Sequence, residues 1–289
     1  MKLIAFFLFF SALGMASNPE RDAALKDIKN TLGMVPKFYE LYPEDGVAGA
    51  WEEMKTLQLN PKTALSGLQK ELIGLGVAAQ IPCHYCGYFH REAAKLNGAN
   101  DAQIREAIAI ASLGRFWATF FNGMQVDFKD FKKDVDKIIA HIKKTMEPGY
   151  TAPAPLVLNT ADDVYKEIEN QMGMVPSFMK LLPKASLPGI WKVFRGVELN
   201  PHSALPGKTK SLISLAVGAQ IPCKYCIYWD TEIAKLDGAT DQEISEAVEM
   251  GGATRFWSTW LNGNRFEEKA FFKEADKIFA YLKKQSEKK

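Results

Sequence analysis

Hydrophobic residues recur at spacings of three and four along most of the chain, and this pattern predicts helices. Residues 130–146 give a clear amphipathic helix, and the apolar stretch 108–121 reads as a buried one. No segment alternates hydrophobic and polar residues with a period of two over a useful length. We therefore predict an all-α fold without a sheet.

Residues typical of helix ends give approximate bounds. Asn18 and Pro19 match an N-cap followed by proline at the first helical position, and this first helix should end near Gly33. The pair Asn60-Pro61 is expected to start a long helix. The remaining helices of the first half are expected over residues 36–42, 47–58, 83–98, 101–121 and 130–146.

The chain contains an internal repeat with an offset of 140 residues. Cys83 and Cys86 recur as Cys223 and Cys226. The same offset relates Gly33–Pro36 to Gly173–Pro176, Trp51 to Trp191, Arg115–Trp117 to Arg255–Trp257, and Asn122-Gly123 to Asn262-Gly263. We therefore predict two helical domains, residues 17–147 and 160–289, joined by a proline-containing linker over residues 148–159.

Residues that begin the second copy and its sixth helix also match capping boxes. Thr160 is followed three residues later by Asp163, and Thr240 by Glu243. Both threonines should therefore cap helices.

The first 16 residues form a different kind of segment. Lys2 precedes an apolar run that ends in small residues, which is typical of a secretory signal peptide. A membrane anchor is the alternative, but the run is shorter than the roughly 20 residues that a span requires. We expect a periplasmic or secreted protein.

Composition and charge exclude some classes of protein. The 289 residues carry a formal net charge of +2, and the basic residues are spread along the predicted helices. No basic stripe of the kind that binds nucleic acid is present. The chain has only four cysteines, all in two C-x-x-C pairs, so it is not a disulfide-stapled scaffold.

The candidate chemistry lies in residues 71–90. Pro82 disfavours helical backbone at Ile81 and suits the first turn of a new helix. On that helix Cys83, Cys86 and His90 lie at positions i, i+3 and i+7. At about 100° per residue they fall within roughly 60° of one another, on one face.

A thiol in the first turn of a helix loses its proton more readily than free cysteine, because backbone N–H groups stabilise the anion. The arrangement therefore suits an attacking thiolate, a resolving thiol and a histidine that moves protons. A structural disulfide and a zinc site formed by Cys83, Cys86, His90 and Glu71 are the alternatives. A c-type haem is excluded, since residues 87 and 227 are not histidine.

The spacing Glu-x11-Cys-x2-Cys-x3-His resembles the hydroperoxidase branch of the alkylhydroperoxidase/carboxymuconolactone decarboxylase family. The flanking sequences LIGLGVAAQ and AAKLNGAND are also similar to that branch. The resemblance implies that Cys86 attacks a peroxide, that Cys83 resolves it, and that Glu71 and His90 relay protons. Some members have histidine just before the second cysteine, where this chain has Tyr85.

The resemblance also implies an activity and partners. We expect a peroxiredoxin-type hydroperoxide reductase that uses no cofactor or metal and is reset by an external dithiol or thioredoxin-like reductant. The family implies that the tandem domains form a pseudo-dimer, and that such units could assemble as a homo-oligomer, for example a trimer. The alternatives are a general thiol–disulfide oxidoreductase, or a decarboxylase or small-molecule binding protein on the same scaffold.

The two copies differ in chemistry. The offset places Ser211 where the first copy has Glu71, and Asp230 where it has His90. A nucleophilic thiol works best with a base and a proton donor nearby. We therefore predict that Cys223 and Cys226 form a structural disulfide or an accessory redox pair.

Overall fold

The computed structural model describes residues 18–151 and 153–287. The predicted signal peptide lies outside these residues. The described chain consists of helices joined by turns and contains no strand, so the predicted all-α fold is confirmed.

The two copies repeat one order of elements. The first copy contains α1 (Pro19–Leu32), α2 (Lys37–Glu40), α3 (Val47–Thr56), α4 (Gly67–Gln80), α5 (His84–Leu96), α6 (Asp101–Gly123) and α7 (Phe128–Thr145). The second contains α8 (Ala161–Met172), η1 (Ser177–Leu181), α9 (Leu187–Val197), α10 (Gly207–Gln220), α11 (Lys224–Leu236), α12 (Asp241–Gly263) and α13 (Glu268–Ser286). The counterpart of α2 is thus a short 3-10 helix.

The predicted helix caps are present. The Asn18 side chain accepts a hydrogen bond from the Arg21 N–H, and Pro19 occupies the first turn of α1. Gly33 ends α1 with a φ of 81°, a left-handed conformation that glycine adopts without steric cost. Thr160 and Thr240 both form the expected capping boxes.

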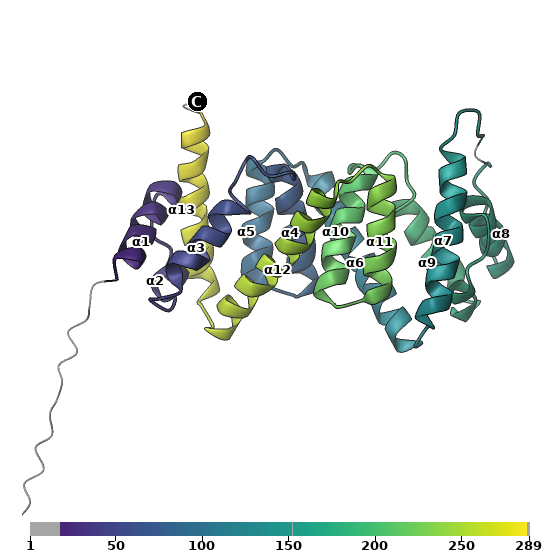
Figure 1. Ribbon diagram of the computed structural model, residues 1–289, viewed down its shortest axis with the longest axis horizontal. Coiled ribbons are helices and arrows are strands. Elements are labelled where there is room, and N and C mark those ends of the chain that lie inside the picture. The colour runs from purple at the N-terminus through teal and green to yellow at the C-terminus, as the bar shows by residue number, and fades with distance from the viewer. Residues whose placement is uncertain (1–17, 152, 288–289) are drawn as a thin grey trace, which may run out of the picture.

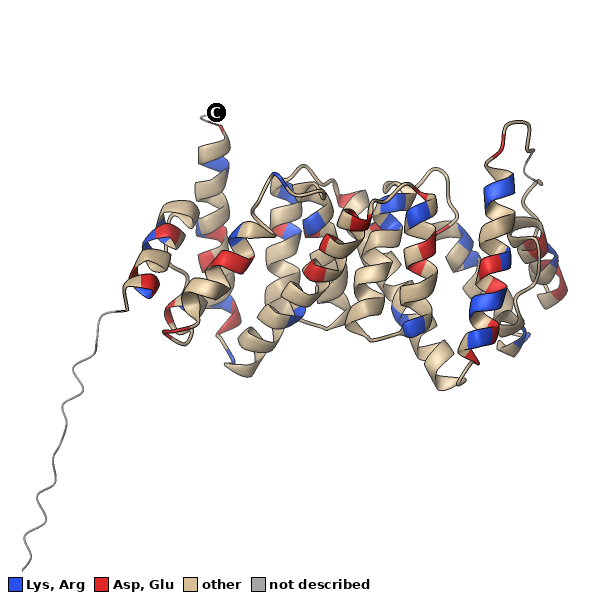
Figure 2. Ribbon diagram, in the orientation of Figure 1, with Lys and Arg blue, Asp and Glu red and all other residues tan. Residues whose placement is uncertain are grey.

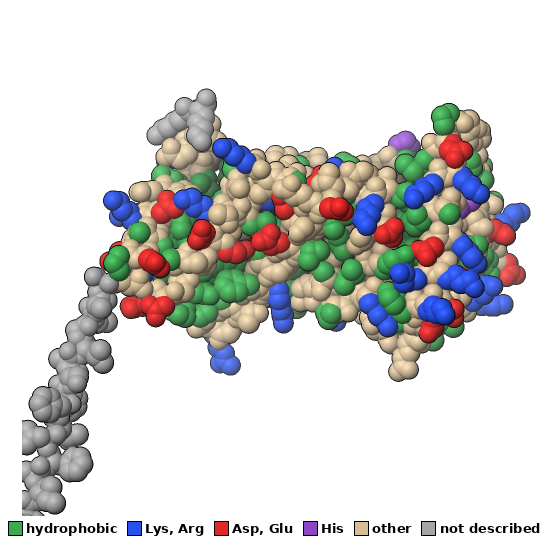
Figure 3. All heavy atoms as spheres, in the orientation of Figure 1, with side chains coloured by type: hydrophobic (Ala, Val, Ile, Leu, Met, Phe, Trp, Pro, Cys, Tyr) green, Lys and Arg blue, Asp and Glu red, His purple; other side chains and the backbone are tan. Residues whose placement is uncertain are grey.

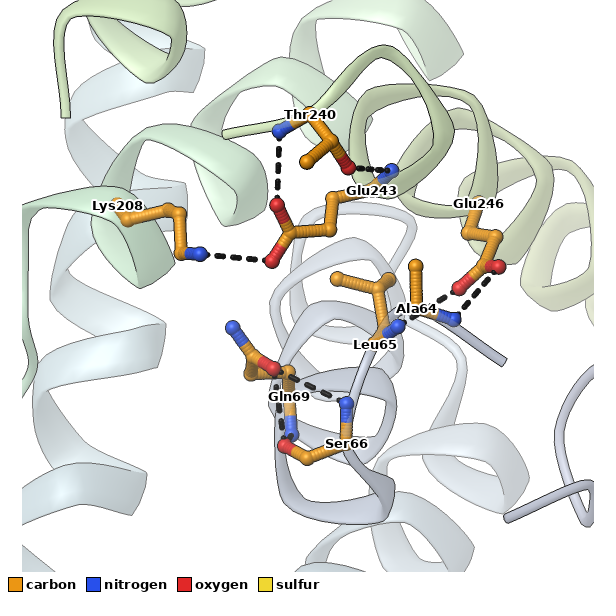
Figure 4. Close-up of polar contacts among 8 residues, drawn as sticks. All are labelled: Ala64, Leu65, Ser66, Gln69, Lys208, Thr240, Glu243 and Glu246. Carbon is orange, nitrogen blue, oxygen red and sulfur yellow. Dashed lines mark hydrogen bonds and ion pairs between the residues drawn. The ribbon is translucent and has the colours of Figure 1, made fainter. Parts of the chain in front are cut away.

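The predicted start of α4 at Asn60-Pro61 is wrong. The helix begins at Gly67, behind a capping box between Ser66 and Gln69. Before it the chain forms a turn, in which the Ala64 and Leu65 N–H groups donate to the Glu246 carboxylate at 2.9 and 2.8 Å (Figure 4). Contacts with the second copy therefore hold this segment out of the helix.

A buried lysine supports the same turn from within the first copy. The Lys70 ammonium donates to the carbonyl oxygens of Leu57 and Asn60 at 2.9 and 2.6 Å. The carbonyl of the buried residue Leu57 thereby has a hydrogen-bond partner. The prediction that Pro82 lies in the first turn of α5 is also wrong. Pro82 precedes Cys83, which is the N-cap of that helix.

The helices form an elongated molecule (Figure 1). Its centre contains α4, α5, α6, α10, α11 and α12, while α1–α3 with α13 and α7–α9 lie at opposite ends. In the central core α4 and α10 pack on each other, with Leu72, Ile73, Leu212 and Ile213 fully buried. Burial of such side chains stabilises the fold by about 1.5–3 kcal/mol each.

The two copies exchange their last helices. Helix α13 packs against α5 and α1 of the first copy, and α7 packs against α11 and α8 of the second. Equivalent hydrogen bonds repeat on both sides: the Tyr85 hydroxyl donates to the Phe266 carbonyl, and the Tyr225 hydroxyl to the Val126 carbonyl. The predicted pseudo-dimer is therefore present, with an exchange that the sequence did not predict.

The surface carries charges of both signs on the outer helices (Figure 2). Figure 3 shows hydrophobic side chains among them, and Phe116 and its counterpart Phe256 are 39% and 42% exposed. Within residues 18–151 and 153–287, no helix combines the length and apolar character needed to cross a bilayer.

The Glu246 contact predicts an effect on stability. Glu246→Ala leaves two N–H groups without their acceptor and should lower the free energy of unfolding by about 2–3 kcal/mol. The matched variant is Glu106→Ala, because within the described part of the chain the Glu106 carboxylate accepts a single hydrogen bond, from the Ala204 N–H. Urea unfolding should show the smaller loss for Glu106→Ala; equal losses would contradict this assignment.

Candidate active site

The first C-x-x-C pair lies at the start of α5. Cys83 is the N-cap, and its Sγ accepts a hydrogen bond from the Cys86 N–H at 3.2 Å. The two cysteines are joined by a disulfide, with their Cα atoms 5.3 Å apart. In the reduced protein the helix N-terminus would stabilise an anion on Cys83 in particular.

A buried chain of polar side chains extends from α5 into the core. The His90 Nδ1 lies 2.7 Å from Glu71 Oε2, and Gln58 Nε2 donates to the two Glu71 oxygens at 3.0 and 3.2 Å. All three side chains are buried. The carboxylate keeps a proton on Nδ1, so Nε2 is the nitrogen that can take up or release one.

Two further residues fix the His90 ring, and both were missed from the sequence. The Thr254 hydroxyl lies 3.3 Å from His90 Nε2 and donates to the Met250 carbonyl at 2.8 Å. On the other side Gly74 leaves room for the ring, because a Cβ there would lie 2.4 Å from His90 Cε1. Gly74 lies nine residues before Cys83, and nothing in the sequence connected it with the motif.

A cavity of about 30 Å³ lies beside this chain, and its walls include Cys86, His90 and Gln58. The second copy contributes Trp257 and Phe271 to the apolar wall. Cys83 does not line the cavity. The structure therefore brings Cys86 and His90 to one space, with Glu71 behind the histidine and Cys83 behind Cys86.

The zinc alternative finds no support in the donor geometry. Among the described residues no group of three or more His, Cys, Asp or Glu side chains could hold a metal ion. Both nitrogens of His90 lie close to protein oxygens, and the two sulfurs are bonded to each other.

Residues 45–127 and 187–266 each match the sequence model of the Carboxymuconolactone decarboxylase family, and together they make up more than half of the chain. The chain belongs to this family. The carboxymuconolactone decarboxylase family consists of enzymes and includes both alkylhydroperoxidase-like peroxidases and decarboxylases. The two matches also confirm the internal repeat.

Two individual proteins illustrate the similarity. An uncharacterised protein of the cox locus of Paracoccus denitrificans is 32% identical over 62 residues, which is 22% of this chain. The chain covers 56% of the length of that relative. A crystal structure of a proposed gamma-carboxymuconolactone decarboxylase subunit from Burkholderia xenovorans LB400 matches with a TM-score of 0.54 and 15% identity, over 93% of this chain and 100% of that one. This last similarity shows the fold alone.

The second copy of the family domain has the same backbone around its cysteines. Cys223 is the N-cap of α11 and is joined to Cys226 by a disulfide. Ser211 and Asp230 stand in place of Glu71 and His90, and Ser214 donates a hydrogen bond to Asp230 Oδ2 at 2.9 Å. Burial raises the pKa of Asp230 well above its usual range, and so favours the neutral form of this carboxyl group.

A further carboxyl group in the second copy was missed from the sequence. The offset of 140 residues places Glu198 at the position of Gln58. Desolvation raises the pKa of Glu198 to about 7, and the nearby Glu106 and Asp237 carboxylates act in the same direction against the Lys210 ammonium. Extending the comparison of the copies beyond the four motif residues would have identified it.

The raised pKa of Glu198 should make the free energy of unfolding depend on pH. Its pKa is raised on folding, so its contribution to the free energy of unfolding falls as the pH rises from about 4.5 to about 7. Glu198→Gln, which restores the residue of the first copy, should increase stability at pH 8 by on the order of 2 kcal/mol and change it little at pH 4.

Urea unfolding of both proteins at pH 4, 6 and 8 measures this difference. The matched control is Gln58→Glu, which should destabilise the first copy because Glu71 already supplies a buried carboxylate there. A difference between wild type and Glu198→Gln that stays constant with pH would contradict the raised pKa.

Proposed function

We propose that the protein is an exported, thiol-dependent hydroperoxide reductase of the peroxiredoxin type, with its active site in the first copy. The observation that carries this proposal is the shared cavity of Cys86 and His90, backed by the buried hydrogen-bonded chain of His90, Glu71 and Gln58. A thiol, a proton carrier and a space for a small substrate thus meet at one point.

The first step is the attack on the peroxide. In the reduced protein the Cys86 thiolate attacks the distal oxygen of the hydroperoxide, and the O–O bond breaks. Cys86 becomes a sulfenic acid, and the leaving alkoxide takes a proton to become an alcohol. His90 is one helical turn from Cys86 and lines the same cavity, so its Nε2 is the group that supplies this proton.

The second step forms the disulfide seen in the structure. The Cys83 thiolate attacks the Cys86 sulfenic acid, and the hydroxide that leaves takes up a proton to become water. The Cys86 N–H, which donates to Cys83 Sγ, stabilises this thiolate. The two sulfurs thus have different roles. Cys86 lines the cavity and attacks the substrate, whereas the Cys83 thiolate is stabilised by the helix and resolves the sulfenic acid.

The third step resets the pair. A dithiol reduces the disulfide by exchange and becomes a disulfide itself. Cys83 and Cys86 are 2% and 4% exposed. This burial favours a small dithiol of the lipoyl type over a folded thioredoxin-like protein, and it disfavours protein disulfides as substrates.

Export and assembly belong to the same proposal. Export is supported by the apolar run after Lys2. Self-association, for example as a trimer, is supported by the exposed rings of Phe116 and Phe256, which the internal symmetry places on equivalent faces.

Peroxide consumption by the mature protein with a dithiol tests the proposed activity. Cys86→Ser should abolish turnover, and Cys83→Ser should stop the protein after one equivalent, with a sulfenic acid on Cys86 that dimedone traps. Glu71→Gln should lower the rate by about 10²-fold or more, because His90 loses its charged partner. The double variant of Cys223 and Cys226 to serine is the matched control and should retain turnover.

The variants also separate the alternatives. Turnover that survives Cys86→Ser would contradict the assigned nucleophile. Reduction of a scrambled-disulfide protein without peroxide consumption would identify a general thiol–disulfide oxidoreductase. Loss of turnover in the folded control variant would show that the second pair takes part in the reaction.

A further inference from the structure

The cavity beside the second cysteine pair is larger than the cavity beside the first. It measures about 60 Å³, against about 30 Å³ beside Cys86 and His90. Its wall is mainly aromatic and includes Trp117 and Phe121 of α6 together with Trp229 of α11. Cys226, Ser214 and Asp230 also line it.

Two exchanges between the copies account for the extra space. The offset pairs Gly114, which lines this cavity, with Thr254, which contacts His90 at the first site. It also pairs Asp230 with the larger His90. In a third exchange Ser214 stands where the first copy has Gly74. The larger side chain fills part of the extra space and adds a hydroxyl group.

The same exchanges leave a polar group facing the cavity with few partners. His90 is held at both ring nitrogens, by Glu71 and by Thr254. Asp230 is 7% exposed, and among the described residues it has one hydrogen-bond partner, the Ser214 hydroxyl on Oδ2. A buried carboxyl group with unused hydrogen-bonding capacity favours a ligand that can pair with it.

The charges around Asp230 decide what kind of ligand fits. Burial raises the pKa of its carboxyl group and so favours the neutral form, which can donate a hydrogen bond. The Glu198 carboxylate adds to this shift through its negative charge, and the Lys210 ammonium is bound to the carbonyl oxygens of Val197 and Glu198. No free cation is thus available among these groups to hold an anion.

We propose that this cavity binds a small, uncharged organic molecule through one acceptor oxygen, with the Asp230 carboxyl group as the hydrogen-bond donor. Cavities of about 150 Å³ hold the six heavy atoms of benzene, so by the same ratio this volume holds about two or three heavy atoms. A ligand as large as acetone would also extend toward the adjoining groove. Short ketones, aldehydes, alcohols and alkyl hydroperoxides share this chemistry. The proposal does not depend on turnover at Cys86.

A neighbouring groove suggests how a ligand could reach this site. A groove of about 280 Å³ lies next to the cavity, and Met172, Phe194 and Trp229 line both. Rotation of these side chains would connect the cavity to the groove, and a longer apolar tail could extend along it. The ligand's oxygen would then lie beside Cys226, in contact with the second disulfide.

Acetone labelled with ¹³C at its carbonyl carbon tests the proposal on the full, oxidised protein. A hydrogen bond from a carboxyl group moves the carbonyl resonance downfield, so titration should give a saturable shift with a dissociation constant in the millimolar range. Acetate has the same size but carries a charge, and at pH 7 it should bind at least tenfold more weakly. No variant is needed for this comparison.

Two variants locate the site. Asp230→Leu removes the donor and should weaken acetone binding about tenfold, whereas Asp230→Asn keeps a neutral donor and should change it less than threefold. Gly114→Thr should remove saturable binding, because a Cβ there already lies 3.4 Å from Ser214 Oγ and the rest of the side chain would fill the cavity. Gly123→Thr on the same helix meets nothing within 4 Å and is the matched control.

Clear results would overturn the proposal. Wild-type protein that gives no saturable shift, or that binds acetate as tightly as acetone, would refute it without any variant. Folded Gly114→Thr protein with unchanged affinity would place the acetone elsewhere. Circular dichroism and thermal unfolding of each variant separate these results from a loss of fold.

Discussion

The packing of each copy's C-terminal helices on the other copy is the constraint on which both sites depend. Helix α12 supplies Thr254 and Trp257 to the site of the first copy, and α6 supplies Gly114 and Trp117 to the site of the second. Neither site is therefore complete within its own repeat. The hydrogen bonds of Glu246 to the turn before α4 belong to the same interface, so the contacts that hold the copies together also position Glu71.

This exchange explains how the two sites could diverge within one fold. Each site has walls from both repeats, so a substitution in one repeat changes one wall of one site and leaves the backbone unchanged. In the first copy Gln58 donates hydrogen bonds to the Glu71 carboxylate, which also pairs with His90. In the second copy carboxyl groups occupy the positions of Gln58 and His90, where burial raises the pKa of both.

The sequence predicted what depends on neighbouring residues. The caps at Asn18, Thr160 and Thr240 are local patterns, and the structure contains them. The start of α4 was predicted wrongly because its position depends on Glu246, which lies more than 180 residues further along the chain. The two residues that fix the His90 ring, Thr254 and Gly74, were missed for a related reason: three-dimensional contact alone connects them with the motif.

Burial does not distinguish the two cysteine pairs. Cys83 and Cys86 are 2% and 4% exposed, and Cys223 and Cys226 are 0% and 5% exposed. In both copies the first sulfur caps its helix and accepts the N–H of the second cysteine at 3.2 Å. The difference lies in the side chains that surround the sulfurs. An imidazole with a carboxylate partner can take up a proton and pass it on. Burial instead raises the pKa of the Asp230 carboxyl group and favours its neutral form, which acts as a hydrogen-bond donor. The two copies therefore share the geometry of the cysteine pair and differ in the proton chemistry beside it. For this reason we propose peroxide reduction in the first copy and ligand binding in the second.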